Sequence, residues 1–188
     1  MQPIFTRILP LGLLLSAGLS ACSGPSITYQ GPPELKIDSL YAYGASGRDL
    51  KLEVQGNGFA GQISGAEFAK RVEAGVQGPL PRAATHPTLN PGPTAKEGYR
   101  LVLLFNPAST MAGQDLCNGR ADQGQPVAGE VHLVGAFCVS GRAETEVIAW
   151  TTATGPQDVR FQELLNQAML TLFRPDPHEN LHGCGQCN

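Results

Sequence analysis

The sequence has few charged side chains, few aromatic rings and no concentration of positive charge. Charged residues make up 15% of the 188 residues and aromatic residues 6%, with a single tryptophan. The 13 basic and 16 acidic side chains give a formal net charge of −3. Because no basic patch stands out, nucleic acid is not expected as a partner. The hydrophobic content of 41% is ordinary, so the composition does not indicate a wholly disordered chain.

The sequence also lacks the run of about 20 apolar residues that a membrane-spanning helix needs. An apolar stretch covers residues 8–19, but it is shorter than that and contains Pro10 and Gly12. Arg7 stands just before this stretch, and small residues follow it. A positive charge, a short apolar segment and small residues before a cleavage point are the parts of a secretory signal. The sequence therefore predicts an exported protein.

Cys22 closes the run Leu19-Ser20-Ala21-Cys22 at the end of this segment. The run resembles a bacterial lipobox, which implies a signal peptide at 1–21 and a lipidated Cys22. Proteins of this type carry a diacylglyceryl thioether and an N-acyl chain such as palmitate, and about two lipid signals give stable anchoring. Ser23, in place of an Asp, implies sorting to the outer membrane in a Gram-negative host. The expected location is thus the outer membrane, with the domain facing the periplasm.

Glycine and proline content divides the remainder of the chain. The lipidated cysteine and a flexible tether are expected at 22–38, where Gly24, Pro25, Gly31, Pro32 and Pro33 disfavour regular structure. Such a tether would span about 50 Å. A single α+β domain is expected at 39–175, followed by a tail with His and Cys residues at 176–188. The mature chain is long enough for one such domain with its own core.

Hydrophobic periodicity predicts four strands and two helices within this domain. Ser64 and Glu67 have capping-box spacing at the start of the first helix, and Thr154 with Gln157 is a candidate capping pair for the second. The expected elements are a strand at 49–55, a helix at 64–78, strands at 99–105, 131–138 and 145–152, and a helix at 155–174. The Gly/Pro-rich segment 78–98 is expected to be a long loop, and such loops are often functional or mobile.

The order strand-helix-strand-strand-strand-helix predicts a mainly antiparallel four-stranded sheet with both helices packed on one face. The strand at 49–55 alternates apolar and polar residues, so it has one solvated face and suits a sheet edge. The strand at 99–105 is almost continuously apolar, which is typical of a central strand covered on both faces. The polar edge favours a monomer.

Four cysteines remain after Cys22, and an even number in an exported chain predicts disulfides. Three pairings are possible. We favour Cys117 with Cys138 and Cys184 with Cys187. The bridge between Cys117 and Cys138 would join a loop to the end of a strand. In the chain-entropy model, this cross-link would stabilise the fold by about 3 kcal/mol.

The tail offers a possible metal site. His178, His182, Cys184 and Cys187 lie within ten residues, and these are ligand types that Zn²⁺ or Cu(I) prefers. Both histidines precede the cysteines, however, which is not the spacing of a zinc finger. An oxidised Cys-x-x-Cys pair would also be a poor ligand. A solvated tail closed by a small disulfide is the alternative.

No catalytic set is evident, and we do not expect an enzyme. Residues 56–61 match G-x-G-x-x-G, but the following helix starts too late to place its N-terminus at a pyrophosphate. Glu130 and His132 share one face of a strand, and together they could act as a general base in a hydrolysis reaction. No nucleophile motif accompanies them. A hydrolase with a site under residues 78–98 is therefore the weakest alternative.

Several segments of the domain are similar to small proteobacterial lipoproteins that bring no activity with them. The resemblance spans most of residues 50–175 and implies that Cys117 and Cys138 pair within the domain. The segments are Arg100–Pro107, Leu116-Cys117, Gly135–Cys138, Phe161–Gln167 and Leu172-Phe173. The sequence thus favours a lipoprotein that binds or structurally supports another envelope component, with a zinc- or copper-binding lipoprotein as the alternative.

Overall fold

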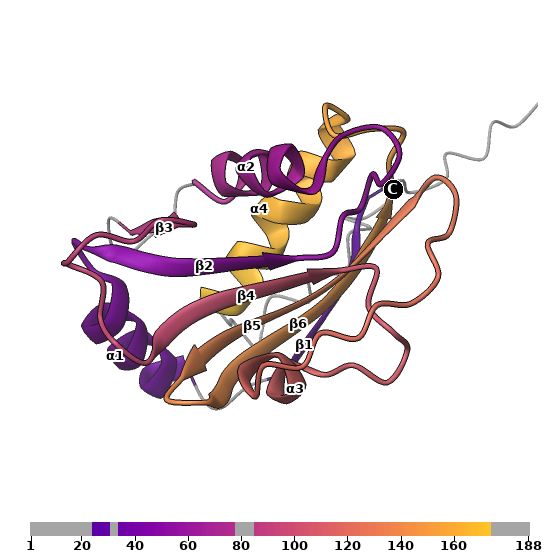
Figure 1. Cartoon of the computed structure of the whole chain (residues 1–188). Coiled ribbons are helices and arrows are strands. Elements are labelled where there is room, and N and C mark those ends of the chain that lie inside the picture. The colour runs from indigo at the N-terminus through magenta and orange to yellow at the C-terminus, as the bar shows by residue number, and fades with distance from the viewer. Residues whose placement is uncertain (1–23, 31–33, 78–84, 174–188) are drawn as a thin grey trace, which may run out of the picture.

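A six-stranded mixed sheet organises the part of the chain that the computed structural model describes, residues 24–30, 34–77 and 85–173 (Figure 1). The strand order across the sheet is β1-β6-β5-β4-β2-β3. The strands are β1 (Ser26–Gln30), β2 (Asp49–Gln55), β3 (His86–Thr88), β4 (Tyr99–Phe105), β5 (Glu130–Val139) and β6 (Arg142–Thr152). The helices are α1 (Glu34–Ala45), α2 (Gly65–Gly75), α3 (Gly113–Cys117) and α4 (Val159–Phe173).

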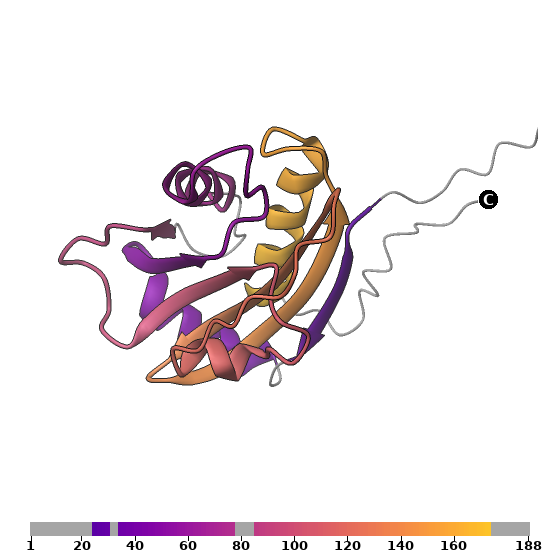
Figure 2. The same cartoon turned by 45° about the vertical axis from the view of Figure 1, so that its right-hand side comes forward.

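The central strands are apolar because they are covered on both faces. In β4, Leu101, Leu103 and Phe105 pack with residues of α2 and α4 in the larger core, whereas Val102 and Leu104 join a second cluster with Leu116 of α3. Figures 1 and 2 show α2 and α4 on one side of the sheet and α3 on the other. This alternation explains how a continuous apolar run forms a strand.

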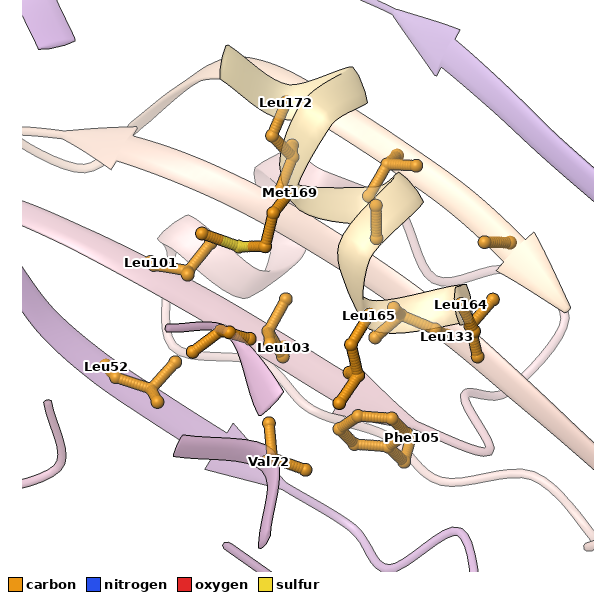
Figure 3. Close-up of a cluster of buried hydrophobic side chains, with 14 of the residues drawn as sticks. Leu52, Val72, Leu101, Leu103, Phe105, Leu133, Leu164, Leu165, Met169 and Leu172 are labelled. Carbon is orange, nitrogen blue, oxygen red and sulfur yellow. The ribbon is translucent and has the colours of Figure 1, made fainter. Parts of the chain in front are cut away.

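The larger core lies between the sheet and α4. Figure 3 shows Leu164, Leu165, Met169 and Leu172 of α4 directed toward the apolar side chains of the strands. Four phenylalanine rings form the part of this core beneath α2, with edge-on contacts such as the 4.7 Å centroid distance between Phe68 and Phe105. The rings belong to Phe59, Phe68, Phe105 and Phe161.

The α+β class is confirmed, but the predicted sheet of four antiparallel strands is wrong. The sheet has six strands, and β2 runs parallel to both β3 and β4. The chain crosses over through α2 after β2, and a helical crossover returns the next strand in the same direction. Two further helices, α1 and α3, were not predicted. β3 escaped detection because it has only three residues and contains Pro87.

The prediction that β2 is an edge strand is also wrong, because β2 lies between β4 and β3. The edge strands are β1 and β3. The expectation of a monomer was based on a polar edge strand at 49–55, so it has no support from the sheet order. The predicted tether at 22–38 must likewise be corrected. Residues 26–30 form β1 and pair with β6, and α1 begins at Glu34. Glycine and proline flank β1 without preventing the strand.

The helix starts show what local signals can predict. The capping box is confirmed, because Ser64 Oγ accepts a hydrogen bond from Glu67 N at 3.2 Å and Glu67 Oε2 accepts one from Ser64 N at 3.1 Å. The prediction that Thr154 and Gln157 cap the last helix is wrong, because α4 begins at Val159. Asp158 precedes α4 instead, and its Oδ1 accepts a hydrogen bond from Arg160 N at 3.0 Å. Among the described helices, none has the length and apolar character needed to cross a bilayer.

Candidate functional site

An exposed apolar and aromatic surface lies on the face of the sheet that α3 covers only in part. From Val147 onward the side chains of β6 alternate between buried and exposed, as a strand with one covered face must. Ile148 is 42% exposed and Trp150 43% exposed. The Cα register places Trp150 opposite His132 of β5, and Glu130 precedes His132 by two residues on the same face. We call Glu130, His132, Ile148 and Trp150 the open-face patch.

Two contacts order the polar half of the open-face patch. His132 Nε2 lies 2.8 Å from Glu130 Oε2, and the imidazole stacks on the indole of Trp150 with a centroid distance of 6.2 Å and an interplanar angle of 17°. The side chains of His132 and Glu130 remain 41% and 34% exposed. In the described part of the chain, no hydrogen bond joins the His132 ring to a serine, threonine or cysteine side chain. The two contacts therefore fix how the imidazole lies against Glu130 and Trp150.

The first strand borders this patch. β1 pairs antiparallel with β6, and its register places Ser26 opposite Trp150 and Thr28 opposite Ile148. Partners in such a register point to the same face, so Ser26 and Thr28 extend the open face to the sheet edge. Figure 2 shows β1 at this outer edge beside β6. The chain thus enters the sheet next to the only tryptophan.

A disulfide between Cys117 and Cys138 fixes the covered part of the same face. Its sulfur atoms are 1.94 Å apart and its Cα atoms 5.5 Å apart. Cys117 ends the short helix α3, although the sequence placed it in a loop. Arg100 Nη2 donates to the carbonyl oxygen of Cys117 at 2.5 Å, which ties the same point to β4. Glu146 Oε2 accepts from Gly113 N at the other end of α3, at 2.6 Å.

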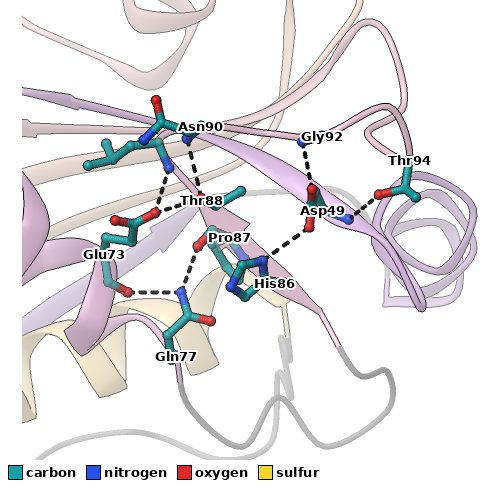
Figure 4. Close-up of polar contacts among 10 residues, drawn as sticks. Asp49, Glu73, Gln77, His86, Pro87, Thr88, Asn90, Gly92 and Thr94 are labelled. Atoms are coloured by element: carbon teal, nitrogen blue, oxygen red, sulfur yellow. Dashed lines mark hydrogen bonds and ion pairs between the residues drawn. The ribbon is translucent and has the colours of Figure 1, made fainter.

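Two carboxylates hold the segment 85–98 against β2 and α2 (Figure 4). Asp49 Oδ2 accepts from Gly92 N at 2.7 Å, and its Oδ1 lies 3.1 Å from His86 Nδ1. Glu73 Oε1 accepts from the Thr88 hydroxyl at 2.6 Å and from Leu89 N at 2.9 Å. The hydrogen bonds of Asp49 lower the pKa of its carboxyl group, and the Gly92 amide contributes most, followed by the His86 side chain.

The pKa of Glu73 is lowered in the same way, chiefly through the Thr88 hydroxyl. Sequence reasoning missed this network. Its members are close only in the folded chain, and neither carboxylate belongs to a motif. In its described part, residues 85–98, the predicted loop is therefore hydrogen-bonded to β2 and α2, and β3 pairs with β2. The two carboxylates therefore hold the loop in place, and both already have hydrogen-bond partners within the protein.

A shallow depression of about 280 Å³ lies at the same end of the sheet as this network. Its cations already have partners. Lys51 Nζ and Arg100 Nε lie 2.8 and 3.6 Å from Glu53 Oε1, and Lys96 Nζ lies 4.5 Å from the Tyr43 ring centre. The lining residues are Lys51, Pro91, Ala95, Lys96, Glu97, Gly98, Tyr99 and Arg100. The depression is consequently a weak candidate for an anion site.

Most of the site residues predicted from sequence fall outside the described residues. These are the signal peptide at 1–21, the lipidation site Cys22, the disulfide pair Cys184 and Cys187, and the metal set His178, His182, Cys184 and Cys187 within the tail at 176–188. Each therefore stays a prediction. Within the ranges that the structure describes, no three His, Cys, Asp or Glu side chains are grouped so as to hold a metal ion.

The hydrolase hypothesis combined His132 with the segment 78–98, and the described part of that segment, residues 85–98, begins far from His132. His86 pairs with Asp49 at the beginning of β2, whereas the carbonyl of His132 accepts from Asn106 N just past the end of β4. These points lie at opposite ends of parallel strands. The glycine-rich residues 56–61 form a turn whose Phe59 is buried against Phe68 and Phe161.

No protein-family model, no curated protein and no solved structure matches this chain. The chemistry of its own residues is therefore the basis for any functional inference.

Proposed function

We propose that this chain is a lipid-anchored protein of the bacterial outer membrane and that its domain binds or supports another envelope component from the periplasmic side. The observation that carries the proposal is the run Leu19-Ser20-Ala21-Cys22 after a charged start and a short apolar segment. The disulfide between Cys117 and Cys138 supports it, because such bridges persist in oxidising compartments outside the cytoplasm.

A binding or structural role is favoured over catalysis by how the acidic groups are used. The carboxylates with lowered pKa values each accept hydrogen bonds that fix a helix start or a loop: Asp49, Glu67, Glu73 and Asp158. The remaining candidate pair, Glu130 and His132, lies on an open sheet face in contact with water. Electrostatic catalysis works best where water is excluded and donors are aimed at a developing charge.

Metal binding through the tail is the second proposal. Its support is the ligand set His178, His182, Cys184 and Cys187, whose soft sulfur and imidazole donors suit zinc or Cu(I). Native mass spectrometry of the mature chain, with and without each metal, tests it. One bound metal that disappears in Cys184→Ser supports this role. A chain four hydrogens lighter than its fully reduced form, with no metal bound, contradicts it and supports two disulfides.

Expression of the full chain in a Gram-negative host tests the anchoring proposal. Mass spectrometry of the N-terminal peptide should show an acylated Cys22 as the first residue, and the protein should sediment with outer-membrane vesicles. Cys22→Ser should abolish both results. Ser23→Asp should retain the lipid and move the protein to the inner membrane. A soluble wild-type chain without lipid would contradict the proposal.

A further inference from the structure

The structure places the start of the folded domain very close to the expected lipid anchor. Four peptide steps separate Cys22 from Ser26, the first residue of β1. A fully extended chain of that length spans only about 14 Å. The tether expected from the sequence, residues 23–38 after the lipidated cysteine, would have allowed about 50 Å. Because β1 is hydrogen-bonded to β6, the domain has to lie at the membrane surface if Cys22 is lipidated.

The point of entry decides which part of the domain is nearest to the membrane. Ser26 is opposite Trp150, and β1 runs from that position toward Glu146 of β6. Gly24 and Pro25, the described residues before Ser26, therefore leave the sheet at the Trp150 end. The Tyr99 end of the sheet is the far one, because Tyr99 pairs with Val139 at the opposite end of β5. The open-face patch is thus an exposed apolar surface next to the point where the chain enters the sheet, and the exposed Val127 and Val159 lie near the same end of β5 and β6.

We propose that the open-face patch rests on the phospholipid surface of the membrane that holds the Cys22 lipid, with Trp150 at the level of the headgroups and Ile148 beside it. Tryptophan prefers this interface, because its ring is apolar and its indole N–H can bond with water or headgroups. This inference depends on the proposed lipid anchor. It adds to that proposal a fixed orientation of the domain.

The patch is too small to hold the protein on a membrane by itself. It offers two apolar side chains, and Glu130 opposes binding to anionic lipids, as does the net charge, which is −3 for the full sequence and −4 once Arg7 is removed with the signal peptide. The anchor changes this balance, since a short linker keeps the patch at a high effective concentration near the bilayer. The lipid therefore supplies attachment, and Trp150 with Ile148 selects which face of the domain touches the membrane.

Trp150 is the sole tryptophan, so its fluorescence reports on this surface alone. The lipidated protein would be reconstituted in phosphatidylethanolamine and phosphatidylglycerol vesicles, with or without brominated acyl chains. We expect the Trp150 emission to move to shorter wavelength and to be strongly quenched by the brominated lipids. The mature chain without lipid should show neither effect with the same vesicles. Ile148→Asp in the lipidated protein should reduce the quenching.

A relocated tryptophan provides the matched control. Trp150→Tyr combined with Tyr43→Trp moves the probe to an exposed position, 58% accessible, next to Tyr99 at the far end of the sheet. Its emission should be insensitive to brominated lipids. Mass spectrometry of each sample separates the two proposals, because a chain without lipid refutes the anchor. A lipidated chain whose Trp150 is not quenched, or is quenched no more than a tryptophan at position 43, overturns the orientation inference.

Discussion

Cys117, the last residue of α3, is bonded to Cys138 near the end of β5. The bridge holds the five-residue helix α3 over the second apolar cluster, where Met111 and Leu116 cover Val102 and Leu104 of β4. A helix this short has little stability of its own. Its position therefore depends on the disulfide, on the Arg100 contact and on this small apolar contact.

Removing the bridge should destabilise the domain. Cys117→Ser is expected to lower the free energy of unfolding by about 2–5 kcal/mol, because the unfolded chain regains the conformations that the cross-link excluded. Urea unfolding without reductant measures the loss. Adding reductant should bring the wild-type protein to the stability of the variant and leave the variant unchanged. A difference near zero before reduction would show that the bridge contributes nothing to stability.

Gly75 lies in close contact with α4 at the end of α2. A Cβ atom at Gly75 would lie 2.5 Å from Leu165 Cδ1 and 3.1 Å from Gln162 Oε1. Because Leu165 is fully buried, Gly75→Ala should lower the free energy of unfolding by about 1–3 kcal/mol despite the better helix propensity of alanine.

Gly65→Ala is the matched control in the same helix, since nothing lies within 4 Å of its added Cβ. It should be neutral or slightly stabilising. Thermal unfolding of the two variants makes the comparison. Equal effects would mean that the helices move apart freely and that the contact at Gly75 is not close packing.

Asp158 should make stability depend on pH. Hydrogen bonds from Arg160 and Thr154 hold the pKa of its carboxyl well below the ordinary range. A depressed folded pKa contributes stability that is present above the unfolded value of about 3.9 and is lost as pH falls toward the folded value. Asp158→Asn should therefore cost about 1–2 kcal/mol at pH 7, and the cost should shrink below about pH 4.

Urea unfolding of wild type and Asp158→Asn at pH 7, 4 and 3 measures this dependence. Asp122→Asn is the control, because Asp122 is paired with Arg120 but its side chain is 62% exposed. Exposed ion pairs contribute little, so this variant should follow the wild type at every pH. A cost for Asp158→Asn that does not change with pH would contradict the role of its charge.

The two carboxylates beneath the segment 85–98 should act on different parts of it. Glu73→Gln should speed amide hydrogen exchange at Leu89, and Asp49→Asn should do so at Gly92, because each loses the charged acceptor of that amide. Global stability should change little in either variant. Hydrogen exchange followed residue by residue separates the effects. Loss of protection across the whole segment in both variants would show that the two networks form one cooperative unit.

The folded core could be predicted where the local signal was strong. The apolar run at 99–105 placed β4 at the centre of the sheet, and Ser64 with Glu67 located the start of α2. β1 and β3 were missed, because glycine and proline flank the first and Pro87 lies within the second. Their pairings with β6 and β2 join residues far apart in the sequence, and local patterns carry no information about such partners.

By itself the sequence determined the α+β class, the buried central strands and a single tryptophan in a β-branched strand. Residues 145–152 are apolar or β-branched at nearly every position, so their pattern does not say which side chains are exposed. Only the tertiary structure decided this. Helix α3 is too short to cover β6 completely, which leaves Trp150 and Ile148 exposed. The pairing of β1 with β6 places the chain's entry into the sheet beside them.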